Sequence, residues 1–88
     1  MADRVITAAE GRVRQGYHMA ATLRAVTLTQ SDGQWTVTGR ILDRNAFRLS
    51  QLPLALTVTY HKGSWTWPIQ ELQIADGTLT ARLGPLER

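Results

Sequence analysis

Two histidines and a few carboxylates are the residues that could hold a metal ion or catalyse a reaction. His18 and His61 lie far apart, and no His-x-His or His-Glu-x-x-His spacing occurs. A metal site would need both imidazoles together with a carboxylate such as Glu71 or Asp76. Asp76 precedes a glycine, and turn formation explains that pair without a reaction. We therefore expect surface or turn histidines, and no bound metal or cofactor.

The chain lacks the motifs of nucleotide-binding and hydrolytic enzymes. It contains no phosphate-binding P-loop, no Gly-x-Gly-x-x-Gly fingerprint and no Gly-x-Ser-x-Gly nucleophile elbow. The absence of cysteine removes thiolate nucleophiles, disulfides and Cys-type zinc or iron–sulfur sites together. General bases are also scarce. The sequence therefore predicts a protein that is not an enzyme and takes no small-molecule substrate.

Aromatic and basic residues are concentrated in one predicted hairpin, which carries Tyr60, Lys62, Trp65 and Trp67. A single-stranded nucleic acid could stack its bases on the tryptophans and place its phosphates near Lys62. The alternative is that the tryptophans fill the core, on the same side of the strand as Ile69. We favour the core, because large aromatic side chains dominate the burial of small domains.

Arginines form the second candidate contact surface. Arg12 and Arg14 flank Val13 as a small positive strip, and Arg24 follows further along the chain. Guanidinium groups bind carboxylates and phosphates through two parallel hydrogen bonds, so an acidic partner is one expectation. A solvated face with scattered ion pairs is the other. The chain has 10 basic and 7 acidic residues and a formal charge of +3, which is mild for a dedicated nucleic-acid binder.

These residues must be positioned by β-strands, because apolar residues alternate with polar and β-branched ones from Val26 to Leu83. Turns containing glycine separate the alternating segments, at Asp32-Gly33, within 61–64 and at Asp76-Gly77. We expect an all-β fold with five to seven strands in an antiparallel, up-and-down meander. Such a meander would form a partly open barrel or a sandwich.

Irregular features interrupt this alternation. Gly39 falls on the inward side, where a bulge or the close approach of another backbone is expected. The inward positions shift by one residue between Ile69 and Leu72, which indicates a bulge or a sharp corner, and one long strand through Arg24-Ala25 would need a bulge there. Asp43 could cap a short helical turn within 43–50, which would lie in a crossover between two hairpins.

The first 24 residues leave two structures open. Apolar residues at helical spacing compete with an alternation from Tyr17 to Leu23, which we favour as extended. Residues 1–16 would then be an N-terminal arm or a first strand, and 17–84 the β core of one domain over 1–88. No segment approaches the ~18 apolar residues of a membrane span, and the N-terminus lacks the apolar core of a signal peptide. We expect no contact with a membrane, and a cytoplasmic protein or one incorporated into a virion or other assembly.

Together these features predict a non-enzymatic interaction module. Its partner would be another protein or further copies of the chain. It could be a structural subunit of a larger assembly, of phage or mobile-element type, or an inhibitor of a host protein. A small β-barrel that binds single-stranded nucleic acid through tryptophan and arginine is the alternative. The predicted contact residues are Arg12, Arg14, Arg24, Tyr60, Lys62, Trp65 and Trp67.

Overall fold

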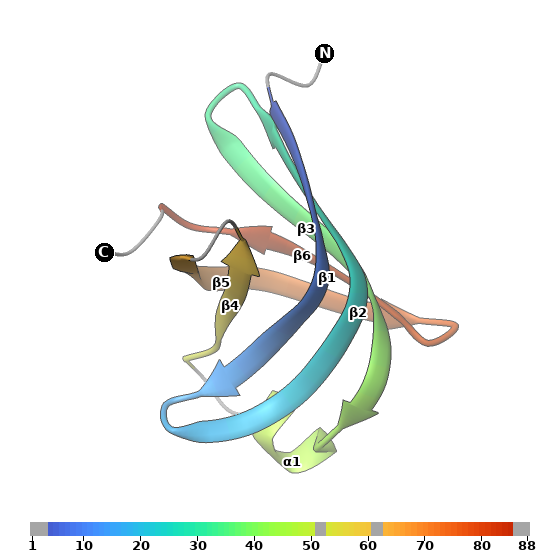
Figure 1. Ribbon diagram of the computed structural model, residues 1–88. Coiled ribbons are helices and arrows are strands. Elements are labelled where there is room, and N and C mark those ends of the chain that lie inside the picture. Colours follow the sequence, from blue (N-terminus) through green and yellow to red (C-terminus); the bar gives the residue numbers. More distant parts are fainter. Residues whose placement is uncertain (1–3, 51–52, 61–62, 86–88) are drawn as a thin grey trace.

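The chain folds almost entirely into β-strands in the computed structural model, which describes residues 4–50, 53–60 and 63–85 (Figure 1). The elements are β1 (Arg4–Gln15), β2 (His18–Ser31), β3 (Gln34–Arg44), α1 (Ala46–Leu49), β4 (Ala55–Tyr60), β5 (Gly63–Ala75) and β6 (Thr78–Leu83). Every neighbouring pair of strands is antiparallel. The expected all-β class is confirmed, and residues 4–15 form a first strand rather than an arm or a helix.

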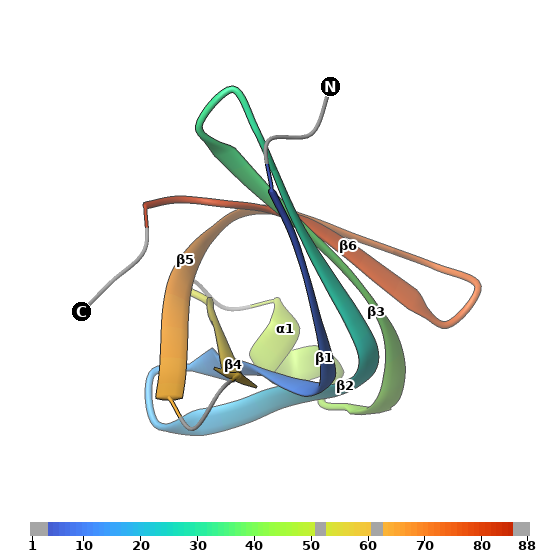
Figure 2. The same ribbon diagram turned by 45° about the horizontal axis from the view of Figure 1, so that its top comes forward.

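The sheet closes into an uneven ring in the order β1-β2-β3-β6-β5-β4. The strands β1–β2–β3 and β4–β5–β6 are two meanders, which we call the N-terminal and C-terminal meanders. They join through β3 and β6, from Trp35–Leu83 to Arg40–Thr78, and through β1 and β4. The path therefore departs from a simple up-and-down order, because β3 pairs with β6 and the chain crosses over to β4. Figure 2 looks into the ring, with α1 at its far end.

Local hydrogen bonds begin this crossover. The Asn45 side-chain Oδ1 accepts a hydrogen bond from the Arg48 N–H at 3.2 Å, and the Asn45 N–H donates to the Ala20 carbonyl at 2.8 Å. Asn45 is therefore the N-cap of α1. The expectation that Asp43 caps the turn was wrong, because β3 continues through Asp43 to Arg44. Leu49 packs against the core at this end of the barrel.

The inward side chains of all six strands fill the ring. Leucine and valine dominate, and the fully buried ones are Val13, Leu23, Val26, Leu28, Val37, Leu56, Val58, Leu79 and Leu83. Gly39 also faces this interior. A Cβ placed on Gly39 would lie 3.2 Å from the Leu23 Cβ, so side chains of β2, and not another backbone, lie close to Gly39. No charged or polar residue is buried within the described part of the chain.

Turns and bulges follow the sequence signals. Asp32 and Gly33 have φ angles of 53° and 77°, and Asp76 and Gly77 have 52° and 74°, as two-residue hairpin turns require. The β2–β3 register shifts between Arg24 and Thr27, and the β5–β6 register shifts between Ile69 and Glu71, so both predicted bulges are confirmed.

Pro68 lies where β5 changes neighbour. β5 pairs with β4 from Gly63 to Pro68 and with β6 from Ile69 to Ala75. Proline lacks the backbone N–H that a continuous ladder of hydrogen bonds would use. It is tolerated at Pro68 because β5 changes its neighbouring strand there. The Pro68 carbonyl accepts a hydrogen bond from the Gly84 N–H at 2.7 Å.

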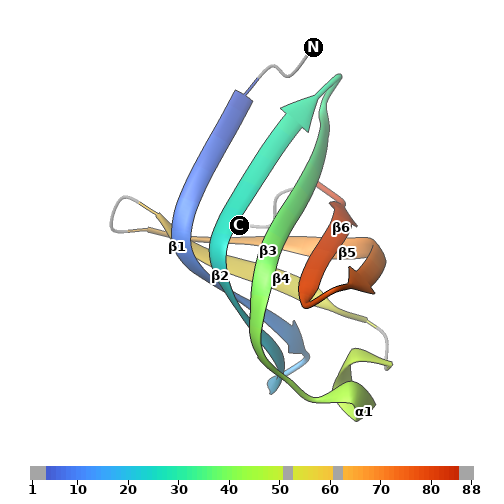
Figure 3. The same cartoon turned by 90° about the vertical axis from the view of Figure 1, so that its right-hand side faces the viewer.

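The first half of β1 has one unpaired side. β1 pairs with β2 from Arg4 to Gln15, but with β4 only from Gly11 to Arg14. The segment from Arg4 to Glu10 therefore has no strand on its second side in the described chain. Figure 3 shows this half of β1 at the margin of the sheet. We call Arg4–Glu10 the free edge.

Candidate functional site

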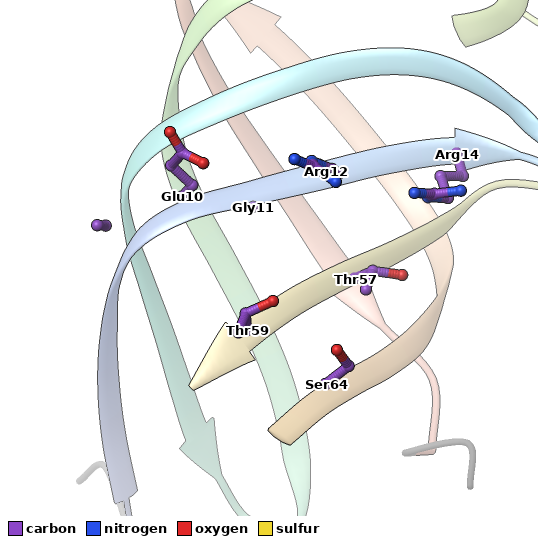
Figure 4. A pocket seen from close by; sticks show the side chains of 8 residues that line it. Glu10, Gly11, Arg12, Arg14, Thr57, Thr59 and Ser64 are labelled. Atoms are coloured by element: carbon purple, nitrogen blue, oxygen red, sulfur yellow. The ribbon is translucent and has the colours of Figure 1, made fainter. Parts of the chain in front are cut away.

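An open cleft lies on the outer face of the barrel, where β1 separates from β4. Its volume is about 390 Å³, and its walls come from β1, β4 and β5 (Figure 4). The lining residues are Ala9, Glu10, Gly11, Arg12, Arg14, Thr57, Thr59 and Ser64. We call it the arginine cleft.

Strand alternation places the arginines there. Val13 is fully buried, so its neighbours Arg12 and Arg14 must project to the opposite, outer face of β1. Val58 is buried in the same way, which turns Thr57 and Thr59 outward. The β1–β4 register sets Arg12 opposite Thr57, and the next pair of strands sets Thr59 opposite Ser64. Two guanidinium groups and three hydroxyl groups thus converge from three strands.

The charge in the cleft is uneven. Glu10 supplies the carboxylate, at the end away from Arg14 (Figure 4). The salt bridge found among the described residues joins Arg82 Nη2 to Glu71 Oε1 at 3.4 Å, on β5 and β6. Neither cleft arginine is therefore paired with a carboxylate of that part of the chain. Arg14 is half-buried and Arg12 is exposed. Such donors can bind an anionic group through charge-assisted hydrogen bonds.

Arg24 lies apart from this pair. It is exposed on β2 beside the bulge, opposite Glu10 of β1 and Arg40 of β3. It does not line the arginine cleft. Of the three predicted arginines, the structure therefore brings together Arg12 and Arg14 and leaves Arg24 on a neighbouring strand.

The two tryptophans of the predicted hairpin differ. Trp67 is 2% exposed and packs in the core, with its ring centroid 5.7 Å from that of Trp35. Its indole Nε1 is buried and has no hydrogen-bond partner within the described part of the chain. Trp65 is 41% exposed, opposite the buried Val58, and does not line the cleft. The prediction that the tryptophans of this hairpin fill the core therefore holds for Trp67 and not for Trp65. The Tyr60 side chain and Lys62 lie outside what the structure describes.

Six lining residues were not among the predicted contacts: Ala9, Glu10, Gly11, Thr57, Thr59 and Ser64. The alternation of β4 does predict that Thr57 and Thr59 face outward. The sequence did not predict that β1 pairs with β4, because these strands lie more than forty residues apart in the sequence. No local pattern encodes that pairing.

Neither a metal site nor a membrane-spanning helix occurs among the described residues. Over residues 4–50, 53–60 and 63–85, no group of three His, Cys, Asp or Glu side chains could hold a metal ion. His61, one of the two histidines considered, falls outside these ranges. No helix in the same ranges has the length and apolar character needed to cross a membrane. The chain matches no protein-family model, and no curated protein or solved structure shows significant similarity to it.

Proposed function

We propose that this chain is a non-enzymatic binding module that uses the arginine cleft to hold an acidic segment of a partner protein. The partner would belong to an assembly in which the chain is a subunit, or would be a protein that the chain inhibits. The observation that carries the proposal is the convergence of Arg12 and Arg14 with three hydroxyl groups in one open cleft.

The chemistry of the cleft suits a carboxylate. A guanidinium group presents two parallel N–H donors that match the two oxygens of a carboxylate, and a hydroxyl group can donate a further hydrogen bond. Each pair in such an exposed setting contributes about 0.2–1 kcal/mol. Two arginines acting together would therefore favour an acidic segment over its neutral counterpart by about tenfold in affinity.

A protein partner fits the cleft better than single-stranded nucleic acid. Non-specific binding of single strands combines a basic groove with aromatic rings on which successive bases stack. No aromatic side chain that the structure describes lines the arginine cleft, and Trp67 is buried in the core. We therefore treat oligonucleotide binding as an outcome of the test and not as the proposal.

Neutralising the cleft is the direct test. The variant R12Q/R14Q removes both positive charges, and R24Q/R40Q removes the same net charge from an exposed pair outside the cleft. We expect a hexaglutamate peptide to bind the first variant about tenfold more weakly than the parent chain. The second variant should bind almost as the parent does. Isothermal titration calorimetry at fixed ionic strength measures both.

Two results would contradict the proposal. An equal loss in both variants would mean that the peptide responds to net charge and not to the cleft. Tighter binding of a deoxythymidine decamer than of hexaglutamate, with a steep fall in affinity as salt rises and quenching of tryptophan fluorescence, would favour the nucleic-acid alternative.

A further inference from the structure

The free edge beside the arginine cleft points to how a partner segment would bind. We infer that an acidic segment adds to the sheet as an extended strand, antiparallel to β1 along Arg4–Glu10, with its acidic end over the cleft. The inference rests on the proposed function for the chemistry of the partner and on the sheet topology for its conformation.

The free edge offers a row of backbone groups. In a strand paired on one side, every second residue directs its N–H and C=O away from the neighbouring strand. Along Arg4–Glu10 these groups face no strand of the described chain. The segment contains three consecutive β-branched residues, Val5, Ile6 and Thr7, and Val5 is 58% exposed. Extended peptides add to edges of this kind through backbone hydrogen bonds.

The sequence of the free edge lacks the usual protection. Natural sheets blunt their edges with proline, inward-pointing charges, lysine, bulges or very short strands. Arg4–Glu10 contains no proline and no lysine, and its charged residues stand at its two ends. The register with β2 runs without a break from Arg4 to Val13. An edge without these devices offers its unpaired backbone groups to a further strand.

The cleft begins where the free edge ends. Ala9 and Glu10 belong to both, and beyond them the same side of β1 is occupied by β4. A strand antiparallel to β1 would start opposite Glu10 and end opposite Arg4. Its N-terminal flank would have to leave the sheet at this fork and lie over the outer face. Arg12 is two residues further, or about 7 Å at roughly 3.3 Å per residue, so a flank of two or three residues reaches it.

Charge selects the occupant. The described part of β1 carries Arg4, Arg12 and Arg14 against Glu10. The free edge itself carries one charge of each sign, Arg4 and Glu10, so the excess to be matched is that of Arg12 and Arg14 in the arginine cleft. An acidic segment complements this excess, so we assign the free edge to a foreign acidic segment and not to a second copy.

The test uses a defined peptide and the whole chain. The probe is acetyl-Glu-Glu-Gly-Thr-Val-Thr-Val-Thr-amide, titrated into isotope-labelled protein and followed by NMR. Binding should slow amide hydrogen exchange at alternate residues of Arg4–Glu10 by about tenfold or more and shift the signals of Arg12 and Arg14. Two further probes carry N-methyl groups on one or the other alternate set of Thr and Val amides. Only one of the two should lose affinity, because one set of amides faces β1 and the other faces solvent.

The protein variant and the methylated probes distinguish the contribution of charge to the affinity from that of backbone hydrogen bonds. R12Q/R14Q should weaken the parent probe about tenfold and leave unchanged a probe with Gln-Gln in place of Glu-Glu. If both methylated probes bind like the parent while R12Q/R14Q weakens binding, strand addition is wrong and the arginine cleft stands. If N-methylation lowers the affinity of the probe and R12Q/R14Q does not, the edge binds a strand, but the inference that this strand is acidic is wrong.

Two other outcomes overturn the inference. No binding of the parent probe at millimolar concentration would mean that the edge does not accept a strand. A dimer by light scattering, with Arg4–Glu10 already protected from exchange before any peptide is added, would assign the edge to a second copy of the chain.

Discussion

A single tryptophan shows how packing and polarity compete inside this small barrel. Trp67 is 2% exposed and belongs to the core, yet its indole N–H has no acceptor among the described residues. A buried donor without a partner costs about 1–3 kcal/mol. The ring nonetheless remains inside because burying a large aromatic side chain contributes at least as much. Trp35, which packs against it at a 53° tilt, supplies part of that contact.

Replacing the ring while removing the donor tests this balance. Trp67→Phe loses apolar contact but also removes the unpaired N–H, so we expect the free energy of unfolding to change by less than about 1 kcal/mol. Trp67→Ala leaves a cavity and should cost about 3–5 kcal/mol. Urea denaturation followed by circular dichroism measures both. A phenylalanine variant as unstable as the alanine variant would show that the indole N–H does contribute a hydrogen bond.

At the scale of single elements, the β2 bulge is where backbone strain is found. Ala25 has a φ of 53°, in the left-handed region that costs an L-residue about 1–2 kcal/mol. The bulge is retained because it shifts the inward positions of β2 from Leu23 to Val26, and both of these side chains are fully buried. The strain at Ala25 is therefore offset by packing on either side of it.

Glycine at this position should relieve the strain. We expect Ala25→Gly to raise the free energy of unfolding by about 1 kcal/mol, because glycine adopts positive φ without steric cost. Ala9 is the matched control, since it is also exposed, lies on β1 between the pairs Ala8–Val26 and Glu10–Arg24, and has no positive φ. Ala9→Gly should lower stability by roughly 0.5–1 kcal/mol. Thermal or urea unfolding of the two variants gives the comparison, and a loss in both would refute strain at the bulge.

Much of this element structure was readable from the sequence. The alternation around Val13 and Val58 determines which neighbours face outward, so the outward orientation of Arg12, Arg14 and Thr57 follows directly from it. The break in alternation near Ala25 likewise marks the bulge. The N-cap was misplaced because Asp43 and Asn45 are both good capping residues, and the choice between them depends on how far β3 pairs.

On the scale of the whole molecule, the barrel is held together by contacts between its two meanders. Their strands pair along β3–β6 and β1–β4, and Trp35 of one meander packs on Trp67 of the other. The inward side chains of each meander are therefore covered by those of the other. The sequence could not show this arrangement, because β4 and β6 carry the same period-two pattern and either could pair with β3. The arginine cleft was hidden for the same reason, since it exists only where β1 meets β4.

Because the two meanders form one core together, we expect the molecule to unfold in one step. Tryptophan fluorescence, which reports on the contact between the meanders, and far-ultraviolet circular dichroism, which reports on the strands, should give coincident urea transitions. The same coincidence is expected at several protein concentrations if the chain is monomeric. Two separate transitions would mean that each meander has a core of its own, against the pairing described above.

The crossover that contains α1 is the sole covalent link between the meanders. Every β1–β4 and β3–β6 pairing would be satisfied equally well if the C-terminal meander came from another molecule. Two chains that exchanged these halves would form an interlocked, domain-swapped dimer in which both barrels are complete. The structural difference between that dimer and the monomer would be confined to the crossover. Asn45, through its bonds to Ala20 and Arg48, holds the start of the crossover against β2.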